Sequence, residues 1–253
     1  MIHNCLPLSI TLPKISVYLL STWLLLASPI THAAKMVLII DDVGERHNDD
    51  VVLSLPTAIT FSILPFSKNG RRLAEAAYAQ QRELMLHLPM ATINAKDPGP
   101  LAITPELDKP EVQRRVQKAL AKIPFVTGVN NHMGSAVTPD KERMGWVMEE
   151  LAKQPLFFVD SLTIHTSTAY EQAKAYGMPS LKRQVFLDPS ADPKVIEQQW
   201  QRALAIAKRH QHVIVIAHPY PNTIAFLQQR LPLNEVELIS VASLLQLQQQ
   251  ASL

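Results

Sequence analysis

Two adjacent carboxylates, Asp41 and Asp42, follow the apolar run MVLII at residues 36–40. An apolar run of this length is typical of a strand that is buried on both faces. Two like charges at the end of such a strand repel each other, so each needs a partner or a chemical task. The pair therefore marks the first candidate site in the chain.

Several later apolar runs also end in polar or ionisable residues. These residues are His87, Asn130, Asn131, His132, Asp160, Asp188 and His218. The carboxyl ends of parallel strands in a barrel lie on one face, so we expect these side chains to converge in space. Histidine and carboxylate without a thiol form a ligand set suited to Zn²⁺, or a similar divalent ion, at an open catalytic position.

Two of the aspartates also have a structural interpretation. Asp188 precedes Pro189, and this arrangement favours a cap for the following helix over a catalytic residue. Asp160 precedes Ser161, and both a loop cap and a role in the site remain open for it. The remaining histidines of the chain after residue 35 fall in helical or loop stretches and are interpreted as surface residues: His47, His165, His210 and His212.

Strand-like and helix-like segments alternate through the chain from residue 35 onward, without an internal repeat or a long linker. Alternation of this kind, with apolar strands, predicts an α/β fold in which helices cover a parallel sheet. Seven or eight such units in one domain fit a closed or nearly closed (β/α) barrel. An open doubly wound sheet is the alternative, and the absence of a Gly-rich loop after the first strand disfavours it.

Residues 1–34 have the layout of a secretory signal peptide. A short positive region containing Lys14 precedes the apolar stretch ISVYLLSTWLLLASPI and the small-residue sequence THAAK. We therefore expect an exported chain of residues 35–253, located in the periplasm or cell envelope. An uncleaved N-terminal anchor is the alternative, and no later stretch approaches the length of a membrane span.

Composition limits the partners of this predicted exported chain. The only cysteine is Cys5, so residues 35–253 contain no disulfide. Lys14 is the only charged residue of the leader, and without it 23 basic residues face 22 acidic ones. This balance gives no reason to expect nucleic acid as a partner.

Six motifs carry a resemblance to a known family: IIDDVG, TFSILPF, LMLHLPM, NNHMGS, FFVDS and VIVIAHP. In order and spacing they resemble the divergent polysaccharide deacetylases, exported relatives of the carbohydrate esterase family 4 (NodB-homology) enzymes. The resemblance extends from Met36 to about Ser243, and IDDVG and NNHMGS are its most specific parts. It implies a distorted (β/α) barrel and metal-dependent removal of N-acetyl groups from glycans.

The resemblance also implies residue roles. Asp41 matches the catalytic base and Asp42 the metal-binding aspartate. His87 matches the first metal-binding histidine, and His218 the histidine that protonates the leaving amine. The family's second ligand, four residues after the first, is replaced here by Ala91, and its arginine motif after the fourth strand is replaced by NNHMGS.

His132 can supply the missing ligand, and this completes a predicted mechanism. A Zn²⁺ ion would be held by Asp42, His87 and His132, and would activate water and polarise the acetyl carbonyl. Asp160 is a candidate partner that orients His218, and Asn130 or Asn131 is a candidate to hold the sugar or the oxyanion.

The predicted substrate is an N-acetylated envelope glycan such as peptidoglycan. The alternative is a non-catalytic envelope protein that uses the same pocket to bind a glycan or a partner. No aromatic platform for a sugar is evident in the sequence, because Trp146 and Trp200 fall in helices and are interpreted as packing residues.

Overall fold

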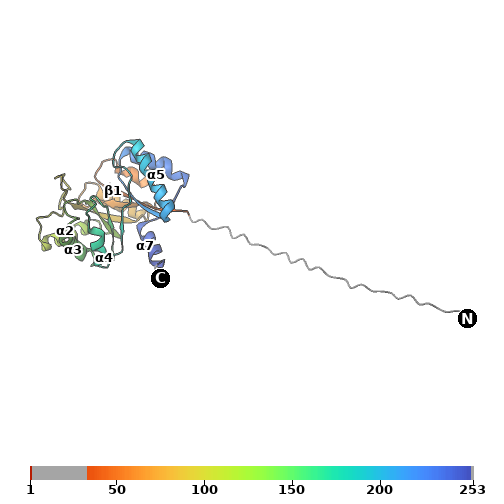
Figure 1. Cartoon of the computed structure of the whole chain (residues 1–253). Coiled ribbons are helices and arrows are strands. Elements are labelled where there is room, and N and C mark those ends of the chain that lie inside the picture. The colour runs from red at the N-terminus through yellow and green to blue at the C-terminus, as the bar shows by residue number, and fades with distance from the viewer. Residues whose placement is uncertain (2–32, 252–253) are drawn as a thin grey trace. The chain divides into compact units, whose positions relative to one another are not determined.

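The computed structural model describes Met1 and residues 33–251, and Figure 1 shows the whole chain. The described residues from Ala33 onward form one compact unit. The predicted signal peptide lies almost entirely in residues 2–32, outside the described residues. Among the described residues, no helix is both long enough and apolar enough to cross a membrane.

One parallel sheet forms the centre of this unit. Its strands are β1 (Lys35–Val43), β2 (Thr60–Ile63), β3 (Leu84–Met90), β4 (Gly128–Met133), β5 (Phe157–Asp160), β6 (Ser180–Lys182), β7 (Val185–Phe186), β8 (His212–Ala217) and β9 (Glu237–Leu238). Eight of them follow the order β6-β5-β4-β3-β2-β1-β8-β7, and β9 pairs with the start of β1.

The two edge strands of this order, β6 and β7, follow each other almost directly in the chain. β6 pairs with β5 and β7 pairs with β8, and only Arg183 and Gln184 separate β6 from β7. The Arg183 amide donates to the Asp160 carbonyl, and the Gln184 amide donates to the Ile214 carbonyl. The sheet therefore curls until its edges are joined by one short segment. The predicted distorted barrel of seven to eight parallel strands is confirmed, and the open doubly wound alternative does not describe this sheet.

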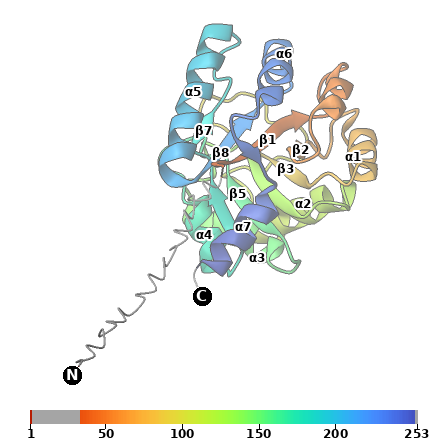
Figure 2. The ribbon, with the colours of Figure 1, turned by 90° about the vertical axis from the view of Figure 1, so that its right-hand side faces the viewer.

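Helices pack around the curled sheet, most of them on its outer face (Figure 2). They are α1 (Gly70–Ala79), α2 (Lys109–Lys122), α3 (Lys141–Leu151), α4 (Ala169–Ala175), α5 (Pro193–His210), α6 (Pro221–Arg230) and α7 (Val241–Gln250), with 3₁₀ turns η1 (Asp49–Ser54) and η2 (Leu231–Leu233). Aspartates begin three of them, because the side chains of Asp108, Asp140 and Asp192 accept from backbone amides of the first turn.

Alternation along β1 divides the core into two clusters. Met36, Leu38 and Ile40 belong to the cluster between sheet and outer helices. Val37 and Ile39 belong to a second cluster on the inner face, which also contains Val241 and Leu244 of α7. Successive strand side chains point to opposite faces, so each strand has an inner and an outer set of residues. α7 thus closes the inner face at the amino ends of the strands.

A short strand and a helix form the last part of the described chain. β9 covers only Glu237–Leu238, and α7 begins at Val241. Ser240 caps this helix, and the carboxylate of Glu83 accepts from the amides of Val241 and Ala242 at 2.8 and 2.9 Å. A negative side chain at a helix N-terminus favours helix over strand at this point.

Candidate functional site

The end of β1 explains how both adjacent carboxylates reach one site. Asp41 continues the inner set of Val37 and Ile39, whereas alternation alone would turn Asp42 toward the outer helices. The pairing of β1 with β2 shifts register between Ile40 and Val43, and Asp42 has a left-handed backbone with φ of 56°. Aspartate tolerates this conformation better than most residues. The irregularity turns the Asp42 side chain into the same pocket as Asp41.

The same alternation brings the other strand-end residues inward. His87 continues the inner set of Met85, and His218 continues that of Ile214 and Ile216. Asn130 is the cross-strand partner of His87. The structure therefore brings together, at the carboxyl ends of the strands, the predicted residues Asp41, Asp42, His87, Asn130, His132 and His218.

Asp42, His87 and His132 form a cluster that fits a metal ion. One ligand atom from each lies within 4.8 Å of the other two. Asp42 Oδ1 is 3.2 Å from His87 Nε2 and 2.8 Å from His132 Nδ1. This oxygen is buried, and neither approach has the geometry of a hydrogen bond.

These spacings suit ligands of a single ion. Ligand atoms about 2.0–2.2 Å from Zn²⁺ are separated from each other by roughly 3 Å or slightly more. Two imidazoles and one carboxylate leave coordination positions open, as catalytic zinc sites do. The residues present therefore fit a divalent metal, and Asp42, His87 and His132 are the ones that would hold it.

His218 is held by Asp188, which corrects two sequence interpretations. Asp188 Oδ1 lies 2.9 Å from His218 Nδ1, and its Oδ2 accepts from the His218 amide and from Thr223 Oγ1. Asp188 is not the cap of the following helix, because α5 begins at Pro193 and its N-cap is Asp192. Asp188 lies two residues after Phe186, which ends β7 and packs against the inner cluster, and it continues the inward orientation of that residue.

Asp160 is a loop cap and not the partner of His218. Its carboxylate accepts from the Leu162 amide, from Ser167 Oγ and from the Tyr170 amide. On β5 the inner residues are Phe157 and Val159, so Asp160 points to the opposite face.

The two asparagines also bind protein groups. The Asn131 side chain accepts from the Ser161 amide and donates to the Met133 carbonyl, so it joins the ends of β4 and β5. Asn130 is fully buried and lies outside the pocket lining. It contacts Asp41 and His87 instead, so of the two asparagines only Asn131, which lines the pocket, remains a candidate to hold the sugar or the oxyanion.

Burial and neighbouring charges set the protonation of the site. Burial raises the pKa of Asp41, and Asp42 adds to this, although His87 and His218 oppose it. Burial also acts to raise the pKa of Asp42, but the His132 and His87 rings outweigh it and hold that pKa well below its usual range. Burial acts to lower the pKa of His218, but the carboxylates of Asp188, Asp42 and Asp41 together outweigh burial and raise it, with Asp188 contributing most.

The pocket around these residues has a volume of about 420 Å³. Phe186 and Tyr220 flank His218, with ring centroids 4.9 and 5.1 Å from the imidazole. Tyr220 is two residues beyond His218 in the loop after β8, and aromatic rings of this kind suit a sugar face. These two rings are not evident as a platform in the sequence, because only the tertiary structure brings Phe186 and Tyr220 against His218.

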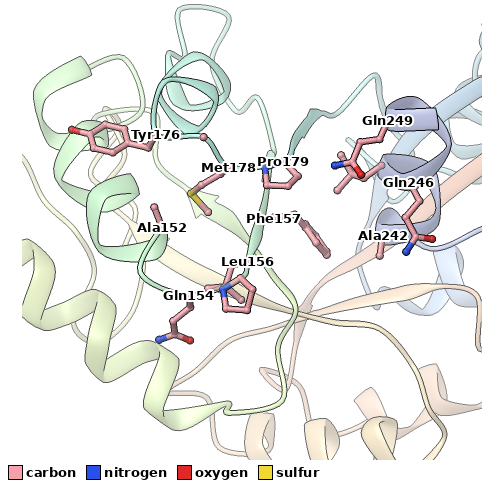
Figure 3. Close-up of a pocket in the computed structure, with 13 residues that line it drawn as sticks. Ala152, Gln154, Leu156, Phe157, Tyr176, Met178, Pro179, Ala242, Gln246 and Gln249 are labelled. Atoms are coloured by element: carbon pink, nitrogen blue, oxygen red, sulfur yellow. The ribbon is translucent and has the colours of Figure 1, made fainter. Parts of the chain in front are cut away.

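A second groove lies at the other end of the strands, between α7 and the segments that enter β5 and β6 (Figure 3). Leu156, Phe157, Met178 and Ala242 line it, together with glutamines such as Gln246. It contains no carboxylate, histidine or basic side chain. The ionisable groups of the strand ends therefore make the other pocket the candidate active site.

Comparisons with known proteins agree with this arrangement. The chain is 38% identical over 226 residues to an uncharacterized protein, YibQ, of Escherichia coli (strain K12), covering 88% of this chain and 70% of that protein. It is 34% identical over 215 residues to an uncharacterized protein of Haemophilus influenzae, covering 83% of this chain and 76% of the relative.

A solved structure shares the fold. The crystal structure of an uncharacterized protein, ATU2773, from Agrobacterium tumefaciens C58 superposes with a TM-score of 0.79 at 21% identity, covering 84% of this chain and 89% of that one. The sequence profile of the family described as divergent polysaccharide deacetylase matches residues 38–247. Since this match spans the barrel and all the strand-end residues, the chain belongs to the divergent polysaccharide deacetylase family.

Proposed function

We propose that this protein hydrolyses the N-acetyl amide of an envelope glycan, with Zn²⁺ as its metal. The observation that carries the proposal is the cluster of Asp42, His87 and His132, which shares one pocket with Asp41 and His218. This pocket thus combines metal ligands, a buried carboxylate and a histidine held by a second carboxylate. A metal ion bound there would supply Lewis-acid polarisation of the acetyl carbonyl and a lowered pKa for water.

Asp41 is suited to act as the general base. Its Oδ2 lies 3.7 Å from His87 Nε2, beside the ligand cluster, while its Oδ1 accepts from Asn130. Burial raises the pKa of this carboxyl, which makes it a better proton acceptor than an exposed aspartate. Asp41 would take one proton from water as the water oxygen adds to the acetyl carbon.

His218 is suited to act as the general acid. Its Nδ1 faces Asp188, so its Nε2 faces the pocket, 3.9 Å from Asp42 Oδ2. The Asp188 carboxylate raises the pKa of this imidazole and thereby favours its protonated form. As the bond between carbonyl carbon and nitrogen breaks, His218 would give its proton to the amine, leaving acetate and a free amino sugar.

Two further features support a glycan in the cell envelope. Tyr220 and Phe186 are partly exposed and line the pocket beside His218, where their rings can contact a bound sugar. The predicted signal peptide supports export, and therefore an N-acetylated envelope polysaccharide such as peptidoglycan.

Acetate release tests the proposal. Zinc-loaded wild type should release acetate from N-acetylated glycan fragments, and Asp41→Asn should lower the rate by roughly 10²–10⁴ at equal zinc occupancy. Asp50→Asn is the matched control, because this exposed carboxylate binds Arg72 and should leave the rate unchanged. Wild-type turnover equal to that of Asp41→Asn refutes the proposal. Glycan binding without any acetate release would instead favour the non-catalytic alternative.

A further inference from the structure

A buried network of side chains lies beneath the candidate metal cluster. It comprises Asp41, Ser62, His87 and Asn130, from the neighbouring strands β1, β2, β3 and β4. Each of the four residues is at most 2% exposed. Ser62 and Asn130 do not line the pocket, so any role they have in the chemistry must act through Asp41 and His87.

The amide of Asn130 joins the other three side chains. Its Oδ1 accepts from Ser62 Oγ at 2.5 Å and lies 2.7 Å from His87 Nδ1. Its Nδ2 donates to Asp41 Oδ1 at 2.8 Å. The opposite orientation of the amide would place a carbonyl oxygen against the Asp41 carboxylate, so the network defines which atom is oxygen.

This orientation determines the tautomer of His87. A carbonyl oxygen only accepts, so the Nδ1 atom of His87 must carry a proton. The neutral imidazole then has its lone pair on Nε2, which faces Asp42 Oδ1 at 3.2 Å. Only a nitrogen with a free lone pair can bind a metal ion.

We propose that Asn130 is a positioning residue that holds His87 in the metal-binding tautomer and Asp41 in place beside it. Ser62 supports this function, because its hydroxyl occupies the second acceptor site of the Asn130 oxygen and keeps the amide from rotating. This inference rests on the proposed metal site, but it assigns a role to two residues that touch neither metal nor substrate.

Two substitutions of Asn130 separate its two contacts. Asn130→Ala removes both, and should weaken zinc binding by about 10- to 100-fold, the usual cost of losing the hydrogen-bond partner of a ligating histidine. Asn130→Asp keeps an acceptor for His87 Nδ1 but replaces the donor to Asp41 with a like charge. It should retain zinc binding better than Asn130→Ala while still losing acetate release.

The measurements are zinc affinity, by competition with a chromophoric chelator, and the His87 tautomer, by ¹⁵N NMR of histidine-labelled apoprotein at alkaline pH. Wild type should show a protonated Nδ1 at His87, and Asn130→Ala should lose this preference. Ser62→Ala should have a smaller effect in the same direction. Thr60→Val is its matched control, because it removes a buried hydroxyl from β2 that binds Glu83 and not the network.

The outcomes distinguish this inference from the proposed function. Folded Asn130→Ala with wild-type zinc affinity and a wild-type His87 tautomer overturns it. If Asn130→Ala does not fold, two other results overturn the inference. One is that His87 of the wild type carries its proton on Nε2, and the other is that Asn130→Asp binds zinc as weakly as His87→Ala. Absence of acetate release by wild type refutes only the deacetylase proposal, because affinity and tautomer are measured without substrate.

Discussion

Replacing Asp188 by asparagine tests the proposed general acid. Asp188 Oδ1 is 2.9 Å from His218 Nδ1, and the carboxylate side chain is fully buried. Asparagine has nearly the same shape, so the pocket should persist, but the negative charge that stabilises the protonated imidazole is lost. A charge-assisted hydrogen bond contributes about 1.5–3 kcal/mol, which corresponds to roughly a 10- to 150-fold fall in kcat.

The pH profile gives the same prediction a second readout. Asp188 raises the pKa of His218, so its removal should lower that pKa. Since the reaction needs His218 protonated, activity is lost as pH rises through this pKa. The alkaline limb of the kcat profile should therefore move to lower pH in Asp188→Asn.

The assay is acetate release across pH by zinc-loaded wild type and variants. Asp160→Asn is the matched control, because Asp160 is also a buried carboxylate at a strand end, but it binds the amides of Leu162 and Tyr170 instead of His218. It can lower stability but should not move the alkaline limb. Thr223→Val, which removes only a donor to Asp188 Oδ2, should give an intermediate effect. If Asp188→Asn changes neither kcat nor the position of the alkaline limb of the pH profile, the assignment of His218 as an acid oriented by Asp188 is refuted.

Three further predictions concern the metal and the barrel. His132→Ala should lose about tenfold or more in zinc affinity, measured by chelator competition, because an open site has few ligands to spare; unchanged affinity contradicts the proposed ligand set. Glu83→Ala should lower the free energy of unfolding, measured by urea titration, by roughly 0.5–2 kcal/mol, because the first amides of α7 lose their acceptor. An unchanged unfolding midpoint argues against this cap. Gly128→Ala should destabilise by about 1–3 kcal/mol in the same assay, because its Cβ would lie 2.0 Å from a ring carbon of Phe157; wild-type stability would show that the ring can move away.

The barrel and the location of the site could be predicted from the sequence because both depend on local pattern. Apolar runs of strand length alternate with helical periodicity, and this pattern alone requires a parallel sheet covered by helices. Polar residues at the carboxyl ends of such strands, including Asp41, His87 and His218, must lie at the same end of the barrel whatever its details.

The orientation of each strand-end residue depends on tertiary structure. Strands buried on both faces are apolar at every position, so their sequence does not reveal which alternate residues face inward. For this reason Asp160 and Asp188 look equivalent in sequence, yet only Asp188 contacts His218. The φ of 56° at Asp42, which turns it toward the site, is likewise a backbone property set by pairing with β2.

What the sequence by itself determined is the fold class, the ends of the strands as the site, and a donor set of carboxylate and imidazole. What only the tertiary structure decided is which of these groups touch. The Asn130 amide contacts Asp41 across 89 residues of chain and His87 across 43, and His218 contacts Asp188 across 30. Such contacts depend on the curl of the whole sheet and on which face each strand turns inward, and no local pattern encodes either.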